Sequence, residues 1–148
     1  MKLRLLLASS AAFLLSAGVA HGACTAGATK TLVRAFVADY DGGKVQSASA
    51  LWAPAPRFQW FSTGAPGARL GPAAYERATL AAYFRMRVRA HESLRLTELH
   101  AGYDPQRHIV DFGGKLVRTA DDLEPMRHPF KGAADCASGR PFLIVWSM

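Results

Sequence analysis

The 148-residue sequence lacks the short motifs that mark several common kinds of enzyme site. It has no Gly-x-Ser-x-Gly elbow, no phosphate-binding loop and no dinucleotide fingerprint, which excludes the sites that those motifs build. No Cys-x-x-Cys pair occurs, and the later histidines lack the close spacing of zinc ligands. These histidines are His91, His100, His108 and His128. We therefore expect no metal and no cofactor.

Repeats, low-complexity segments and domain linkers are also missing, and the length is that of one globular domain. Basic and aromatic residues do not interleave as they would in a platform for single-stranded nucleic acid, so we expect no nucleic-acid partner. The densest basic cluster, Arg85, Arg87 and Arg89, lies on an expected helix, where the three cannot form one stripe. A solvated helix face is the favoured interpretation.

The N-terminus has the layout of a secretory signal peptide. Lys2 and Arg4 precede the apolar stretch 5–15, and small residues follow it. The apolar stretch is too short to span a bilayer comfortably, so no transmembrane segment is expected. We expect a signal peptide over 1–23 and one mature domain over 24–148. Cleavage could fall after Ala20, Gly22 or Ala23.

Removal of this segment lowers the formal charge of the chain from +7 to +5, because Lys2 and Arg4 leave with it. The mature domain is expected in the periplasm or secreted, where its positive charge favours contact with anionic surfaces. A lipoprotein anchored through Cys24 is the alternative. It is less favoured, because His21 stands where lipoprotein signals normally carry a leucine-like residue.

Cys24 and Cys136 are the only cysteines in the chain. An exported chain enters an oxidising compartment, where an even number of cysteines favours pairing. We expect a Cys24–Cys136 disulfide that joins the mature N-terminus to a late strand. A lipidated Cys24 could not form it.

Hydrophobic periodicity predicts an α+β domain. The expected order is helix, helix, strand, helix and then four strands, with the last four strands antiparallel neighbours. Two prolines break the pattern at 121–130, and Gly113-Gly114 indicates a bulge or bend. The expected helices lie within 28–44, 44–52 and 73–91, and the expected strands lie at 57–62, 93–104, 108–120, 131–137 and 141–148.

This order resembles the nuclear-transport-factor-2-like superfamily, which includes SnoaL-like proteins and ketosteroid isomerase. The stretches that carry the resemblance are VRAFVADYDGGK, SALWAPAPRFQWFS and GRPFLIVWSM. The resemblance covers the mature chain and implies a cystatin-like cone, in which a curved, mainly antiparallel sheet wraps three helices around an apolar cavity. It also implies a homodimer, because many members of the superfamily are dimers.

The chemistry of ketosteroid isomerase does not carry over to this sequence. Its oxyanion-stabilising tyrosine falls on Phe36, and its general-base aspartate falls on Trp60. Phe36 has no hydroxyl group and Trp60 cannot abstract a proton. Asp135 lies near the place of the second, protonated aspartate. Two of the three places hold the wrong side chain, so the resemblance argues against this isomerase activity.

The cone would bind a small, largely apolar ligand through aromatic residues and one arginine. For each residue the alternative is an ordinary place in the core, or at the surface in the case of the arginine, which we expect to reach solvent. The lining candidates are Phe36, Tyr40, Trp52, Phe58, Trp60, Tyr83, Arg87 and Trp146.

Catalytic residues are not identified by any motif, and whether the protein is an enzyme stays open. Glu98 and His100 share one strand face and would form an acid–base pair inside the cone, but exposure is favoured. Asp135 would have a raised pKa if it were enclosed. Arg118 is expected to form a surface ion pair with Asp121 or Asp122.

Three functions therefore remain. The leading hypothesis is a small-molecule-binding domain. The alternatives are a cofactor-independent isomerase or dehydratase, and a dimeric interaction module of the cell envelope.

Overall fold

The computed structural model describes residues 24–54, 59–61, 77–137 and 140–148. The expected signal peptide and Phe58 lie outside these residues. Three helices and five strands follow one another in the predicted order. They are α1 (Ala26–Asp41), α2 (Val45–Ala50), β1 (Gln59–Phe61), α3 (Arg77–Arg89), β2 (Ser93–Asp104), β3 (Ile109–Ala120), β4 (Leu123–Ala137) and β5 (Arg140–Ser147).

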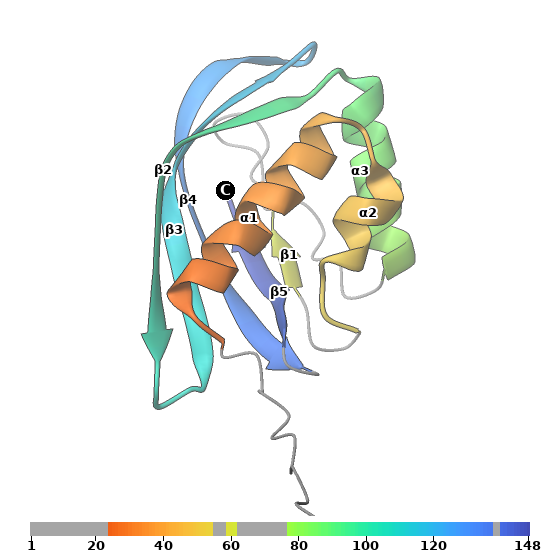
Figure 1. Ribbon diagram of the computed structural model, residues 1–148. Helices are drawn as coiled ribbons and strands as arrows, with labels where there is room; N and C mark the ends of the chain where they lie inside the picture. Colours follow the sequence, from red (N-terminus) through yellow and green to blue (C-terminus); the bar gives the residue numbers. More distant parts are fainter. Residues whose placement is uncertain (1–23, 55–58, 62–76, 138–139) are drawn as a thin grey trace, which may run out of the picture.

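The five strands form one sheet in the spatial order β1-β5-β4-β3-β2. Strands β2 to β5 are antiparallel neighbours, as predicted, and β1 lies parallel to β5. The last strand is therefore paired on both sides. Figure 1 shows the sheet strongly curved, with the three helices on its concave side. Helix α1 packs against β2, β3 and β5 and fills much of the cone.

Helix α1 begins at a side-chain cap and ends at glycine. The hydroxyl of Thr25 accepts a hydrogen bond from the Ala28 N–H at 3.0 Å, which satisfies one of the free donors of the first turn. Beyond the helix, Gly43 has a φ of 66°, a conformation that glycine adopts without strain. The side chains of Val33 and Phe36 are completely buried on the helix face that meets the sheet.

Helix α3 buries an arginine and exposes a valine. Leu80 and Phe84 are buried, whereas Val88 is 37% exposed and Arg87 faces inward with only 6% exposed. The spacing 80, 84, 87 is a regular helical repeat, so Arg87 continues the buried face. Its guanidinium group must therefore find partners inside the protein.

Strand β4 is longer than predicted, because it runs without a break through Pro125 and Pro129. Proline cannot donate a ladder hydrogen bond and is tolerated where one side of the strand is free. Strand β5 pairs with β4 only from Lys131 onward. At both prolines β4 therefore has β3 as its only neighbour among the described strands.

The predicted bend at Gly113-Gly114 lies beside an irregularity in the β2–β3 pairing. The register shifts between Leu96 and Glu98, just across from the glycines. A side chain at Gly114 would collide with the backbone carbonyl of Glu98. The two strands approach each other too closely here for any residue except glycine.

A disulfide joins Cys24 to Cys136, as predicted, with the two Cα atoms 5.7 Å apart. It fixes the start of α1 to the end of β4 across 112 residues of chain. In the part of the chain that the structure describes, none of the helices has the length and apolar character to cross a membrane.

Candidate functional site

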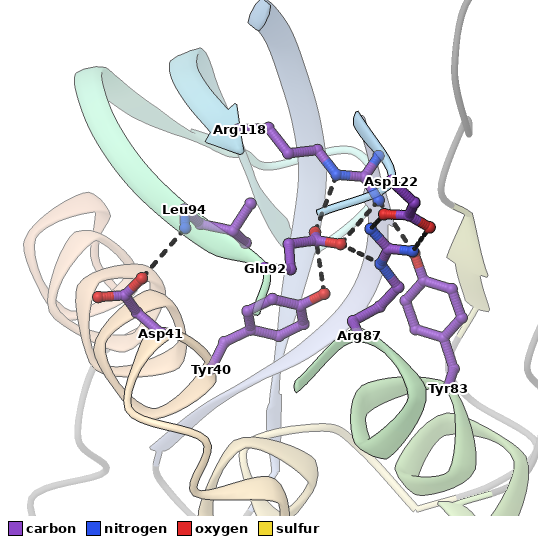
Figure 2. A network of polar contacts seen from close by, with 8 residues as sticks. All are labelled: Tyr40, Asp41, Tyr83, Arg87, Glu92, Leu94, Arg118 and Asp122. Atoms are coloured by element: carbon purple, nitrogen blue, oxygen red, sulfur yellow. Dashed lines mark hydrogen bonds and ion pairs between the residues drawn. The ribbon is translucent and has the colours of Figure 1, made fainter. Parts of the chain in front are cut away.

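A buried cluster of charges lies where the end of α3 meets β2 and β3, and Figure 2 shows it. Its centre is Glu92, in the turn between α3 and β2, whose side chain is completely buried. One carboxylate oxygen accepts hydrogen bonds from the Tyr40 hydroxyl at 3.0 Å and from Arg118 Nε at 2.8 Å. The other accepts from Arg118 Nη2 at 3.1 Å and from Arg87 Nε. A carboxylate removed from water needs such a shell of donors.

Arg87 connects this centre to the β3–β4 turn. Its Nη1 and Nη2 donate to the two carboxylate oxygens of Asp122 at 2.7 and 2.8 Å, a bidentate pair. The hydrogen bond to Asp122 raises the pKa of Arg87 above its ordinary value, and the same bond lowers the pKa of Asp122. The expectation that Arg87 reaches solvent is wrong, because its side chain is buried and bonded to Glu92 and Asp122.

The cluster balances its own charge. Arg87 and Arg118 carry two positive charges, and Glu92 and Asp122 carry two negative ones. Burial, and next the charge of Glu92, raise the pKa of Tyr40 well above its ordinary value, so its hydroxyl stays protonated and donates. Arg118 does not form the predicted surface pair, since it is 3% exposed and bonded to Glu92. We conclude that this network positions α3 against the sheet.

A surface hollow of about 460 Å³ lies beside the network, between the end of α1 and the start of β2. Asp41 accepts a hydrogen bond from the Leu94 N–H at 3.2 Å at its edge (Figure 2). Its wall contains two glycines and a mixture of polar and apolar side chains, and the carboxylate of Glu92 is already bonded. The residues that line it are Tyr40, Asp41, Gly42, Gly43, Val88, His91, Glu92 and Ser93.

The inner face of the β3–β4 pair carries a second polar group, His128. It is paired across the strands with Leu116 and stands diagonally from Arg118 on the same face. The ring is half-buried, and its Nε2 atom is buried with no hydrogen-bond partner among the described residues. Burial, and next the positive charge of Arg118, lower the pKa of His128, so the imidazole is neutral at pH 7.

Apolar side chains adjoin this histidine. Leu116 is completely buried, and Phe130, two residues along β4 on the same face, is 4% exposed. The Phe130 ring stacks on Trp146 with centroids 4.9 Å apart. The hydroxyl of Tyr83, on α3, accepts a hydrogen bond from Arg118 Nη2 at 3.4 Å. The neutral imidazole of His128 therefore lies beside the apolar side chains of Leu116 and Phe130. The polar groups of Arg118 and Tyr83 lie next to them.

Most of the predicted lining residues are packed against one another. Phe36, Trp52 and Trp146 are completely buried, and Tyr40 is 3% exposed. The Phe36 ring lies 5.8 Å from Trp52 and 5.1 Å from Trp146, centroid to centroid, both in edge contacts. Of Trp60 only the backbone is described, and it pairs with Trp146. A role for these residues in ligand binding stays a prediction.

The three candidate catalytic residues do not come together. Glu98 is exposed and pairs with Lys115 at 3.0 Å and Arg127 at 3.3 Å. His100 is exposed. Asp135 is half-buried near the other end of the sheet. Among the described residues no three His, Cys, Asp or Glu side chains gather as a metal site would require.

Sequence reasoning missed Glu92 and His128. Glu92 follows the helix in a polar stretch, and His128 lies between two prolines in a segment that was not predicted to be a strand. A signal for Glu92 did exist, because Arg87 falls on the buried face of α3 and a buried arginine requires a carboxylate.

Known structures share this fold. No protein-family model and no curated protein sequence matches the chain. An uncharacterised protein with a cystatin-like fold from Caulobacter vibrioides superposes with a TM-score of 0.66 and 11% identity, over 82% of this chain and 85% of that one.

Two further structures agree. A nuclear-transport-factor-2-like protein with a cystatin-like fold from Novosphingobium aromaticivorans gives a TM-score of 0.63 and 12% identity over 82% and 78% of the two chains. A nuclear-transport-factor-2-like protein of unknown function from Shewanella oneidensis gives a TM-score of 0.60 and 12% identity over 82% of this chain and 95% of that one. At this identity the likeness shows the fold, and the cystatin-like cone predicted from the sequence is confirmed.

Proposed function

We propose that this nuclear-transport-factor-2-like domain is exported and binds a small, largely apolar molecule that carries one hydroxyl or carbonyl oxygen. The oxygen would bond to Nε2 of His128, and the apolar part would lie along Leu116 and Phe130. One observation carries the proposal. The Nε2 atom is buried on the inner face of the curved sheet without a hydrogen-bond partner in the described part of the chain.

An unpaired buried polar atom is costly, by about 1–3 kcal/mol. A ligand oxygen at hydrogen-bonding distance would recover much of this cost and add the gain from burying its own apolar surface. Because the lowered pKa keeps His128 neutral, Nε2 can either donate to a carbonyl or accept from a hydroxyl. The positive charge of Arg118 is already matched by Glu92, so the site favours an uncharged ligand.

Export is supported by two features that are independent of the ligand. The first 23 residues have the order of a signal peptide. The Cys24–Cys136 disulfide is of a kind that persists in oxidising compartments, such as the periplasm or the extracellular space. Peptide mapping of the protein from its native host, without reducing agent, tests this. Export predicts a cut after residue 20, 22 or 23 and a linked Cys24 peptide, whereas a lipid on Cys24 would contradict the disulfide.

The ligand is tested by native mass spectrometry of the mature protein purified from its host. We expect a bound small-molecule mass on the wild type that is lost in His128→Phe. His128→Gln, which keeps a hydrogen-bonding amide, should retain part of it. His100→Phe is the matched control, because it makes the same change at an exposed histidine. The same spectrum gives the number of subunits, which tests the expected homodimer.

Circular dichroism of each variant checks that it is folded. Since His128→Phe removes an unpaired polar atom, the empty variant should be at least as stable as the empty wild type. Retention of the same bound mass by a folded His128→Phe would refute the site. A wild type that carries no small molecule from its host would refute the binding function.

A further inference from the structure

Charge is unevenly divided between the helices and the sheet. The described residues from 26 to 92 contain seven lysines and arginines and three acidic residues. Residues 93–147 contain seven basic and seven acidic residues. The net positive charge of the described residues therefore lies on the helical side of the cone, and this segregation is not visible in the overall composition.

The charges on the sheet are largely matched by ion pairs, and those on the helices are not. On the strands, Arg107 pairs with Asp104 and Asp111, and Glu98 pairs with Lys115 and Arg127. On the helices, Lys44 pairs with Asp39, and Arg87 is bonded inside. Five basic residues there have no carboxylate partner in the described part of the chain. They are Lys30, Arg34, Arg77, Arg85 and Arg89.

Helix α3 presents a continuous exposed stripe. Ala78, Ala82, Arg85, Met86 and Arg89 follow one another at helical spacing, and all five are exposed. Met86 is 52% exposed and stands between the two arginines. We call these five residues the α3 stripe. It combines two arginines that have no carboxylate partner in the described part of the chain with one flexible apolar side chain, that of Met86, and two alanines.

A cleft of about 370 Å³ between α2 and α3 continues this surface. Arg77 and Arg85 both line it. Arg77 is held in place, since its Nη1 donates to the carbonyl of Ser49 at 2.5 Å and its Nη2 to the carbonyl of Trp52 at 2.6 Å. Both acceptors are uncharged carbonyls, so among the residues that the structure describes no carboxylate matches the positive charge of Arg77 at the wall of the cleft.

We propose that the α3 stripe and the adjoining cleft dock on the surface of an anionic phospholipid bilayer. Lipid phosphates would bond to Arg85 and Arg89 and enter the cleft beside Arg77, because the guanidinium fork matches phosphate geometry. Met86 would enter the headgroup region, where an apolar side chain gains from leaving water. This exposed methionine favours a bilayer over an acidic protein or a nucleic acid, which the charges alone would also attract. The inference does not depend on the ligand proposed above.

The expected strength is modest. A basic residue near an anionic membrane surface contributes about 1 kcal/mol. Loss of Arg85 and Arg89 together should therefore weaken binding by about thirtyfold, since 1.4 kcal/mol corresponds to a factor of ten. The attraction should fall steeply as salt is raised, because exposed charges are screened.

Vesicle co-sedimentation of the mature protein tests the proposal. Phosphatidylcholine vesicles with and without one third phosphatidylglycerol are compared for the wild type, for Arg85→Gln/Arg89→Gln and for Met86→Ser. The matched control is Arg95→Gln/Lys131→Gln, which removes the same charge from exposed sites on the sheet. We expect binding only to the anionic vesicles, a loss of about thirtyfold in the α3 double variant, a smaller loss in Met86→Ser, and wild-type binding in the control.

Three results would overturn the proposal. Equal losses of vesicle binding in the two double variants would show that binding responds to net charge alone. Equal binding to neutral and anionic vesicles would remove the role of phosphate charge. Tight retention on a soluble polyanion such as heparin, with no binding to anionic vesicles, would assign the α3 stripe to an acidic polymer.

Discussion

The buried carboxylate at the centre of the charged cluster gives the sharpest test of what holds the domain together. The change is Glu92→Gln, which keeps the size of the side chain and removes its charge. Glu92 accepts hydrogen bonds from Tyr40, Arg87 and Arg118 within a fully buried site. A glutamine has one acceptor oxygen and an NH2 group, which would face the two guanidinium groups with donors. Both arginines would then be poorly compensated.

Breaking a buried ion pair by removing one partner costs about 3–5 kcal/mol. Here the lower end applies, because Asp122 still compensates Arg87 and the Asp122 side chain is 57% exposed. We expect Glu92→Gln to lower the free energy of unfolding by about 3 kcal/mol. For a domain of this size 1 kcal/mol corresponds to about 4 °C, so Tm should fall by about 12 °C.

Urea unfolding followed by tryptophan fluorescence measures the change. Glu98→Gln is the matched control, because Glu98 also has two basic partners but its side chain is 48% exposed. Exposed pairs contribute about 0–1 kcal/mol, so this variant should unfold close to the wild type. If the two variants lose the same stability, burial of the cluster does not matter and the reasoning is refuted.

Two further changes test other parts of the fold. Replacing Cys24 and Cys136 by serine should lower the free energy of unfolding by about 2–5 kcal/mol, because the disulfide closes a loop of 112 residues; urea midpoints that match the oxidised protein would contradict this. The pKa of Tyr40 is raised in the folded state, by burial first and then by Glu92, so unfolded chains ionise first as pH rises above about 10. The stability that this tyrosine contributes is complete below that pH and is lost above it. The free energy of unfolding should therefore fall less steeply with rising pH in Tyr40→Phe than in the wild type or in Tyr103→Phe. An identical slope in all three proteins would disprove the linkage.

The order of the elements could be predicted because each depends on local patterns. Val33, Phe36, Val37 and Tyr40 recur at helical spacing and are buried in α1. The closing apolar run from residue 141 became a strand between two others. Such patterns report which face a segment must bury, and a single sequence contains that information.

Strand β4 could not be predicted in full, because proline forbids a strand only where its N–H is needed. Whether Pro125 and Pro129 face a neighbour depends on how far β5 extends, which is a property of the assembled sheet. Glu92 was missed for a similar reason. Its partners Tyr40 and Arg118 are distant in sequence, and the position of Arg87 on the buried face of α3 indicates that a carboxylate is needed without indicating which one.

The same helix explains why the arginine-rich stretch FRMRVRAH was hard to interpret. Residues in a helix are separated by about 100°, so Arg85 and Arg89 share one face and Arg87 lies nearly opposite. Glu92 and Asp122 bind Arg87 on the inside, and this contact fixes the rotation of α3. The outward direction of Arg85, Met86 and Arg89 is therefore a consequence of the buried cluster. One sequence run supplies both an internal arginine that is neutralised by carboxylates and an external pair, Arg85 and Arg89, that has no carboxylate partner among the described residues and that we propose binds an anionic surface.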